Sequence, residues 1–120
     1  RPKPNEAAIA NLVGDLRNKH VLIIDDMIDT AGTTCNAAEA AMANGANSVM
    51  AVATHPVLSG SAIERLTKSP INKVIVCNTI YMPESKKFEK LEIINVAHVF
   101  GESIKRIVDG TSLSSMFKSV

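Results

Sequence analysis

Residues 21–34 read Val-Leu-Ile-Ile-Asp-Asp-Met-Ile-Asp-Thr-Ala-Gly-Thr-Thr. The four consecutive apolar residues predict a β-strand over 21–24 that is buried on both faces, as parallel strands usually are. Two carboxylates follow where this strand is expected to end, and a loop of small and hydroxyl-bearing residues comes next. A helix is expected to begin near Thr34. Because ligands bind at the carboxyl ends of strands in open α/β sheets, we expect a binding site in this segment.

The rest of the chain repeats this alternation of strand and helix. Three further apolar runs predict strands over residues 49–53, 74–77 and 91–96. The last of them alternates in polarity and is expected nearer an edge of the sheet. Helical spacing and end signals predict helices over residues 34–44, 61–68 and 98–109. This order is typical of right-handed βαβ units and predicts an α/β fold with a mostly parallel sheet flanked by helices.

Length and composition indicate one domain over residues 1–120, with a lead-in over 1–17 and a tail over 111–120. The chain is 46% hydrophobic, which suffices for a core, and its net charge of +1 argues against a nucleic-acid-binding protein. No apolar run is long enough for a membrane helix. The two cysteines lack the spacing of a metal site and are typical of a reducing cytoplasm. Residues 5–16 are Ala-rich, and their composition is typical of a helix.

The loop suits a phosphate group. Its residues are small, so a ligand can approach their backbone N–H groups, and Gly32 is expected to adopt a positive φ. The start of the following helix adds free N–H donors and a partial positive charge. Three hydroxyls, those of Thr30, Thr33 and Thr34, can donate further hydrogen bonds, with Ala31 between them.

The aspartates suit a different part of the ligand. An ionised carboxylate accepts hydrogen bonds and donates none, so Asp25 and Asp26 fit the two hydroxyls of a ribose, and a Mg²⁺ ion is a further candidate ligand. Phosphate at one end and carboxylates at the other describe a ribose phosphate. The alternative is structural: the pair merely ends a strand and Asp29 caps the next helix.

The same run resembles the phosphoribosyl pyrophosphate (PRPP) binding motif of type I phosphoribosyltransferases and PRPP synthetases. That motif is an apolar strand, two acidic residues, two variable positions and then Asp-Thr-Ala-Gly-Thr. The resemblance implies a type I phosphoribosyltransferase fold. It also implies that Asp25 and Asp26 contact the ribose 2- and 3-hydroxyls and that Asp29, Thr30, Ala31, Gly32, Thr33 and Thr34 enclose the 5-phosphate.

The flanking segments resemble the synthetase branch. The similar segments are residues 1–6, 13–15, 54–63, 78–80 and 110–117. The resemblance implies a C-terminal, ribose 5-phosphate-binding half, whose full-length enzyme transfers the diphosphoryl group of Mg-ATP to ribose 5-phosphate and yields PRPP and AMP. An N-terminal half of similar fold would hold most of the ATP site. The resemblance also implies a catalytic role for Arg1, a homo-oligomer, and a regulatory phosphate or ADP near Ser112 and Ser114.

Several alternatives stay open at this point. A phosphoribosyltransferase that consumes PRPP and a non-catalytic, synthetase-associated regulatory subunit share the same motif. His55 follows the second strand and either lines the site or has a structural role, whereas His20 and His98 are expected to be structural. Three lysines, Lys86, Lys87 and Lys90, form a solvated face or meet nucleotide phosphates.

Overall fold

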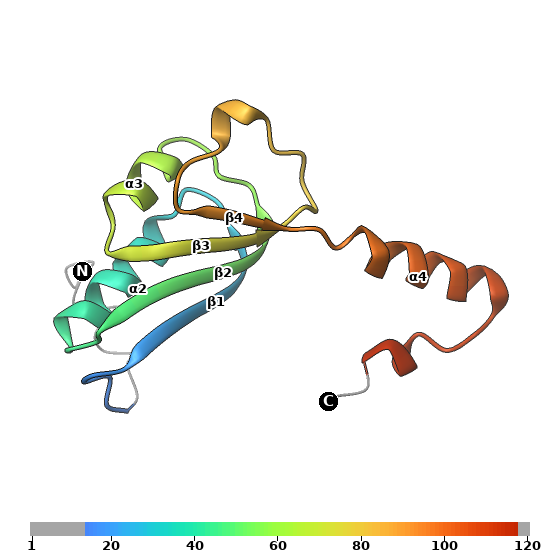
Figure 1. The fold of residues 1–120 in the computed structure, drawn as a ribbon, viewed down its shortest axis with the longest axis horizontal. Helices are drawn as coiled ribbons and strands as arrows, with labels where there is room; N and C mark the ends of the chain where they lie inside the picture. Colours follow the sequence, from blue (N-terminus) through green and yellow to red (C-terminus); the bar gives the residue numbers. More distant parts are fainter. Residues whose placement is uncertain (1–13, 118–120) are drawn as a thin grey trace, which may run out of the picture.

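The computed structural model describes residues 14–117 as a parallel sheet with helices around it (Figure 1). The elements are, in chain order, β1 (His20–Ile28), α2 (Gly32–Ala43), β2 (Ser48–Pro56), α3 (Ala62–Lys68), β3 (Ile71–Cys77), the short helix η1 (Glu84–Lys86), β4 (Leu91–Ile94), α4 (Ala97–Asp109) and η2 (Ser114–Phe117). The sheet order is β1-β2-β3-β4, and all pairs are parallel. The predicted fold class is confirmed, and the fourth strand lies at an edge.

One face of the sheet packs against α2 and α3. Alternate residues of β2, namely Val49, Ala51 and Ala53, are buried beneath the helices. Val74 and Val76 of β3 extend the same core. The buried face of α2 consists mainly of alanines, which allow the helix backbone to approach the sheet closely and bring its N-terminus near the end of β1.

The opposite face of the sheet is uncovered in the described part of the chain. Val21 and Ile23 pack on the core, so Leu22 and Ile24 point the other way, and Ile24 is 73% exposed. The expectation that the first strand is buried on both faces was wrong. The reason is tertiary: α4 continues beyond the end of β4 and does not fold back over the sheet (Figure 1).

Several boundaries differ from those predicted. β1 continues to Ile28, so the two adjacent aspartates lie inside the strand rather than after it. α2 begins at Gly32, two residues earlier than predicted, and ends at Ala43 with Asn44 as its C-cap. The predicted helix over residues 5–16 lies mostly outside the described residues, and residues 14–16 are not helical. Between residues 14 and 117, no helix combines the length and the apolar character needed to cross a membrane.

Candidate functional site

The carboxyl end of β1 forms one wall of a small cavity. Only Asp29, Thr30 and Ala31 separate β1 from α2. The cavity has a volume of about 170 Å³ and is lined by Asp25 and by every residue from Met27 to Thr34. The structure therefore brings together seven of the eight residues that the sequence assigned to ligand binding, all except Asp26.

The loop depends on an unusual backbone conformation. Ala31 has φ 67° and ψ 7°, a left-handed conformation that is sterically unfavourable for residues other than glycine, and it is only 3% exposed. The expected positive φ at Gly32 was wrong, because Gly32 is the first residue of α2 and its φ is not positive. The preceding residue makes the turn instead.

The start of α2 offers several free N–H groups. Within residues 14–117, the first backbone donation by this helix is from the Cys35 N–H to the carbonyl of Ala31, at 2.9 Å. The N–H groups of residues 31–34 donate no hydrogen bond in the same part of the chain. An α-helix leaves its first N–H groups without acceptors, and together with the helix dipole they attract an anion.

The three threonines differ in exposure. The side chains of Thr30 and Thr33 are exposed, whereas Thr34 is buried with 7% of its surface accessible. The hydroxyls of Thr30 and Thr33 are therefore directly available to a ligand in solution.

The adjacent aspartates point in different directions. Neighbouring residues of a strand project to opposite faces, so Asp25 lines the cavity and Asp26 faces the side of Ile24. Each carboxylate accepts a hydrogen bond from the next residue: Asp25 from the Asp26 N–H and Asp26 from the Met27 N–H, both at 2.8 Å. Both side chains remain exposed and can accept further hydrogen bonds.

Asp29 joins the loop to the segment after β2. The Ser59 hydroxyl donates to the Asp29 carboxylate, and the Ser59 N–H donates to the Asp29 carbonyl at 3.0 Å. The adjacent Leu58 N–H donates to the carbonyl of Ile28, also at 3.0 Å. Sequence reasoning did not assign Ser59 to the site, since only the fold brings residue 59 next to residue 29.

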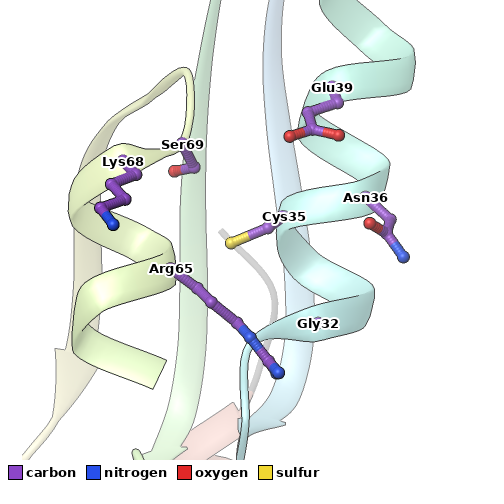
Figure 2. A pocket seen from close by; sticks show the side chains of 7 residues that line it. All are labelled: Gly32, Cys35, Asn36, Glu39, Arg65, Lys68 and Ser69. Carbon is purple, nitrogen blue, oxygen red and sulfur yellow. The ribbon is translucent and has the colours of Figure 1, made fainter. Parts of the chain in front are cut away.

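Arg65 is a second residue that sequence reasoning missed. It extends from α3 toward the start of α2 (Figure 2). Its Nη1 donates to the carbonyl of Thr30 at 3.1 Å. It lines a separate, open cavity of about 530 Å³ between the two helices, together with Gly32, Cys35, Asn36, Glu39, Lys68 and Ser69. Burial raises the pKa of the Cys35 thiol, so this cysteine is protonated and weakly nucleophilic near neutral pH.

Two of the three histidines, His20 and His55, have polar partners away from the small cavity. His55 Nδ1 lies 2.7 Å from the Thr79 hydroxyl, which donates to the carbonyl of Thr54 at 3.1 Å. The Thr79 oxygen therefore accepts a hydrogen bond from His55, and this bond links the end of β2 to the segment just after β3. His20 Nδ1 lies 2.6 Å from the Ser48 hydroxyl, and His98 is exposed at the start of α4.

Of the three lysines, Lys87 is exposed as a solvated face predicts, whereas Lys86 and Lys90 are partly buried and donate to backbone carbonyls. Lys90 Nζ donates to the carbonyls of Leu66, Thr67 and Ser69 at 3.0, 2.9 and 3.0 Å. It therefore caps the C-terminal end of α3. Lys87 pairs with Glu84 at the surface, at 2.6 Å.

The tail forms a cluster of hydroxyls beside a cation. The Ser112 and Ser114 hydroxyls lie 2.7 Å apart, and Arg106 of α4 donates to the Ser112 carbonyl at 2.8 Å and to the Ser115 hydroxyl. Arg1 lies outside the described residues. Within the described range of 14–117, no three His, Cys, Asp or Glu side chains gather as a metal site.

Comparison with known proteins identifies similar chains over nearly the whole length. Residues 2–118 match the family described as the phosphoribosyl synthetase-associated domain. The ribose-phosphate pyrophosphokinase of Aquifex aeolicus is 52% identical over 117 residues, and that of Caldanaerobacter subterraneus is 50% identical over 117 residues. Each alignment covers 98% of this chain and 37% of the relative.

A solved structure is similar as well. The crystal structure of phosphoribosylpyrophosphate synthetase from Mycobacterium smegmatis superposes with a TM-score of 0.79 at 37% sequence identity. The match covers 82% of this chain and 33% of that chain. The chain thus spans little more than a third of the length of these relatives.

Proposed function

Because the chain belongs to the phosphoribosyl synthetase-associated domain family, we propose that it is the ribose 5-phosphate-binding half of an enzyme that makes PRPP. The observation that carries this proposal is the cavity at the end of β1, where free N–H groups and a carboxylate lie side by side. The full enzyme transfers the β,γ-diphosphoryl group of Mg-ATP to the 1-hydroxyl of ribose 5-phosphate and releases AMP. The assignment as a C-terminal half follows the resemblance of the flanking segments.

The 5-phosphate binds in the loop from Asp29 to Thr34. Backbone N–H groups from Ala31 onward donate to its oxygens, and the exposed hydroxyls of Thr30 and Thr33 add two further donors. Asp29, which is hydrogen-bonded to Ser59, stabilises the loop rather than meeting the anion with a free charge.

The sugar lies toward the aspartates. Asp25 lines the cavity and accepts a hydrogen bond from one ribose hydroxyl. Asp26 projects to the opposite face of β1, and its assignment to the neighbouring hydroxyl follows the family resemblance of the motif. The nucleophile is the sugar's own 1-hydroxyl, so this half contributes to catalysis by positioning. Arg1 would add positive charge near the transferring group.

Mg²⁺ enters with ATP. It is typically bound by one or two carboxylates together with substrate phosphates, and the exposed Asp25 and Asp26 fit that limited role. Bound there, the ion would neutralise charge on the diphosphoryl group. Most of the ATP site belongs to an N-terminal half.

The exposed apolar surfaces support a larger assembly. The uncovered sheet face carries Leu22 and Ile24, and α4 exposes Phe100, Ile104 and Ile107. Such surfaces usually pack against other protein, so we assign them to contacts with the N-terminal half and with further copies in a homo-oligomer.

Ser112 and Ser114, next to Arg106, are proposed to bind a regulatory phosphate or ADP. Two free cysteines fit a cytoplasmic location.

Titration calorimetry with ribose 5-phosphate and with inorganic phosphate tests this function. We expect the 120-residue chain to bind both, and Thr33→Val to weaken both by roughly 5- to 10-fold, because it removes a donor at similar volume. Thr67→Val is the matched control, since that hydroxyl donates to the Ile63 carbonyl within α3. A wild-type chain that binds neither ligand would contradict the proposal and favour a non-catalytic associated subunit.

A further inference from the structure

The guanidinium group of Arg65 contacts the proposed phosphate loop. This group donates to the Thr30 carbonyl, and Arg65 lines the larger cavity rather than the small one. Figure 2 shows Arg65 extending from α3 toward the start of α2. A Cβ atom added at Gly32 would lie 3.6 Å from Arg65 Nη1, so the guanidinium also packs directly against the first residue of α2. Arg65 thus contacts the loop without facing the proposed ligand.

This contact determines the direction of one N–H group. The Thr30 carbonyl and the Ala31 N–H belong to the same peptide unit, and in a trans peptide these two bonds point to opposite sides. Since the carbonyl is turned toward Arg65, the Ala31 N–H is turned away from it. Ala31 lines the small cavity, so its N–H is available to an anion there.

The same peptide unit needs support. Ala31 is held in the left-handed conformation, which an alanine does not adopt without compensating contacts. Two hydrogen bonds flank it: Arg65 donates to the Thr30 carbonyl, and the Cys35 N–H donates to the Ala31 carbonyl. A charged donor on a carbonyl also polarises its peptide unit and strengthens the N–H as a donor.

We propose that Arg65 is a positioning residue for phosphate binding: its hydrogen bond to the Thr30 carbonyl orients and polarises the Ala31 N–H toward the anion. This inference rests on the proposed function of the loop. Its substrate class is the phosphate group of a phosphorylated sugar, and Arg65 acts on that group through the peptide unit without touching it.

Lys68 provides a matched control. It lies on the same helix and lines the same cavity as Arg65, so its removal deletes the same charge from the lining of that cavity. Its Nζ pairs with Glu64 at 2.8 Å, and the hydrogen bond to Glu64 raises the pKa of Lys68. A long-range effect of charge would be shared by both residues, whereas an effect through the Thr30 carbonyl belongs to Arg65 alone.

The test compares Arg65→Met, Arg65→Lys and Lys68→Met by calorimetry with inorganic phosphate and ribose 5-phosphate. We expect Arg65→Met to weaken both ligands by roughly 3- to 10-fold and Lys68→Met by less than about twofold. Arg65→Lys should recover part of the affinity, since an ammonium group can still donate to the carbonyl. Thermal unfolding of each variant verifies that the fold is retained.

A second readout needs no ligand. The backbone amide signal of Ala31 in a ¹⁵N–¹H correlation spectrum should shift in Arg65→Met and stay in place in Lys68→Met. Unchanged phosphate affinity in Arg65→Met, or an equal loss in Lys68→Met, would overturn the role of Arg65 while leaving the loop as the binding site. If the wild-type chain binds neither ligand, the proposed function itself fails, and the inference fails with it.

Discussion

At the scale of single residues, the cavity at the end of β1 separates two kinds of group. Free N–H groups of the loop and of α2 suit an anion, whereas the exposed carboxylate of Asp25 suits hydroxyl groups. A bare phosphate and a sugar phosphate would share the first set of contacts, and only the sugar would use the second. Variants of the aspartates can therefore distinguish the contribution of the sugar to binding affinity from that of the phosphate.

We predict that Asp25→Asn lowers the affinity for ribose 5-phosphate about 10-fold, equivalent to roughly 1.4 kcal/mol, because a charge-assisted hydrogen bond is lost. Inorganic phosphate should bind at least as tightly, because a negative charge near the anion is removed. Asp26→Asn should likewise lower the affinity for ribose 5-phosphate, and inorganic phosphate should again bind at least as tightly. Calorimetry with both ligands measures these affinities.

Asp15→Asn is the control for charge, since Asp15 pairs with Arg17 at the surface. Equal losses of sugar phosphate and bare phosphate in the Asp25 and Asp26 variants would show that these carboxylates have a structural role.

A further prediction concerns the two cysteines. Cys35 is buried, and burial raises its thiol pKa, so the reactive thiolate is scarcer than for an ordinary exposed cysteine at the same pH. Iodoacetamide at pH 8 should therefore modify the partly exposed Cys77 first and Cys35 slowly, with the Cys35 rate rising as the pH is raised. Peptide mass spectrometry over time measures both rates, and faster modification of Cys35 would contradict its burial.

At the scale of the elements, α3 is held in place by residues from other parts of the chain. It has only seven residues, and its N-cap Ser61 makes no side-chain hydrogen bond to it. Its C-terminal carbonyls instead receive three hydrogen bonds from Lys90, which precedes β4. This link matters for the site, because α3 carries Arg65.

We predict that Lys90→Met lowers the free energy of unfolding by about 1–2 kcal/mol, because three carbonyls at the end of α3 lose a charged donor. Lys87→Met is the matched control and should change it by less than about 0.5 kcal/mol, since the exposed pair with Glu84 contributes little. Urea unfolding measures both variants. Equal stability of the two would show that the cap is not needed.

At the scale of the whole molecule, the described chain is extended rather than compact. Its radius of gyration is 17.1 Å, compared with about 13 Å for a compact domain of similar length. α4 accounts for the difference, because it projects away from the sheet (Figure 1). Both the open face of the sheet and the apolar side of α4 are left for protein contacts, and either surface can support association.

We predict that the chain self-associates at micromolar concentration and forms no PRPP from Mg-ATP and ribose 5-phosphate. Sedimentation velocity over a concentration series, with a PRPP-forming assay beside it, measures both. Two variants, Ile24→Lys on the sheet and Ile104→Lys on α4, identify which surface mediates self-association. A lysine that becomes buried in the contact weakens association, whereas a lysine on a surface outside the contact does not.

A strict monomer at all concentrations would contradict the assignment of these surfaces to contacts between copies. Measurable turnover would contradict the assignment of this chain as one half of the enzyme.

Local sequence patterns were sufficient to predict the order of the strands and helices and the position of the loop between β1 and α2. Apolar runs such as residues 74–77 and the glycine C-cap at Gly110 are local signals, and local signals are sufficient for elements of this kind. Most of the residues that line the small cavity were also predictable, because they are nearly consecutive in the chain, with Asp25 followed by residues 27–34.

Other features depended on the tertiary structure, which local patterns do not specify. It placed the left-handed turn at Ala31 rather than Gly32, where Arg65, 35 residues further along the chain, donates to the Thr30 carbonyl of the adjoining peptide unit. It turned Asp25 and Asp26 to opposite faces, because β1 continues through them. It also left one face of the sheet open, since no local pattern determines whether a later helix folds back over a strand.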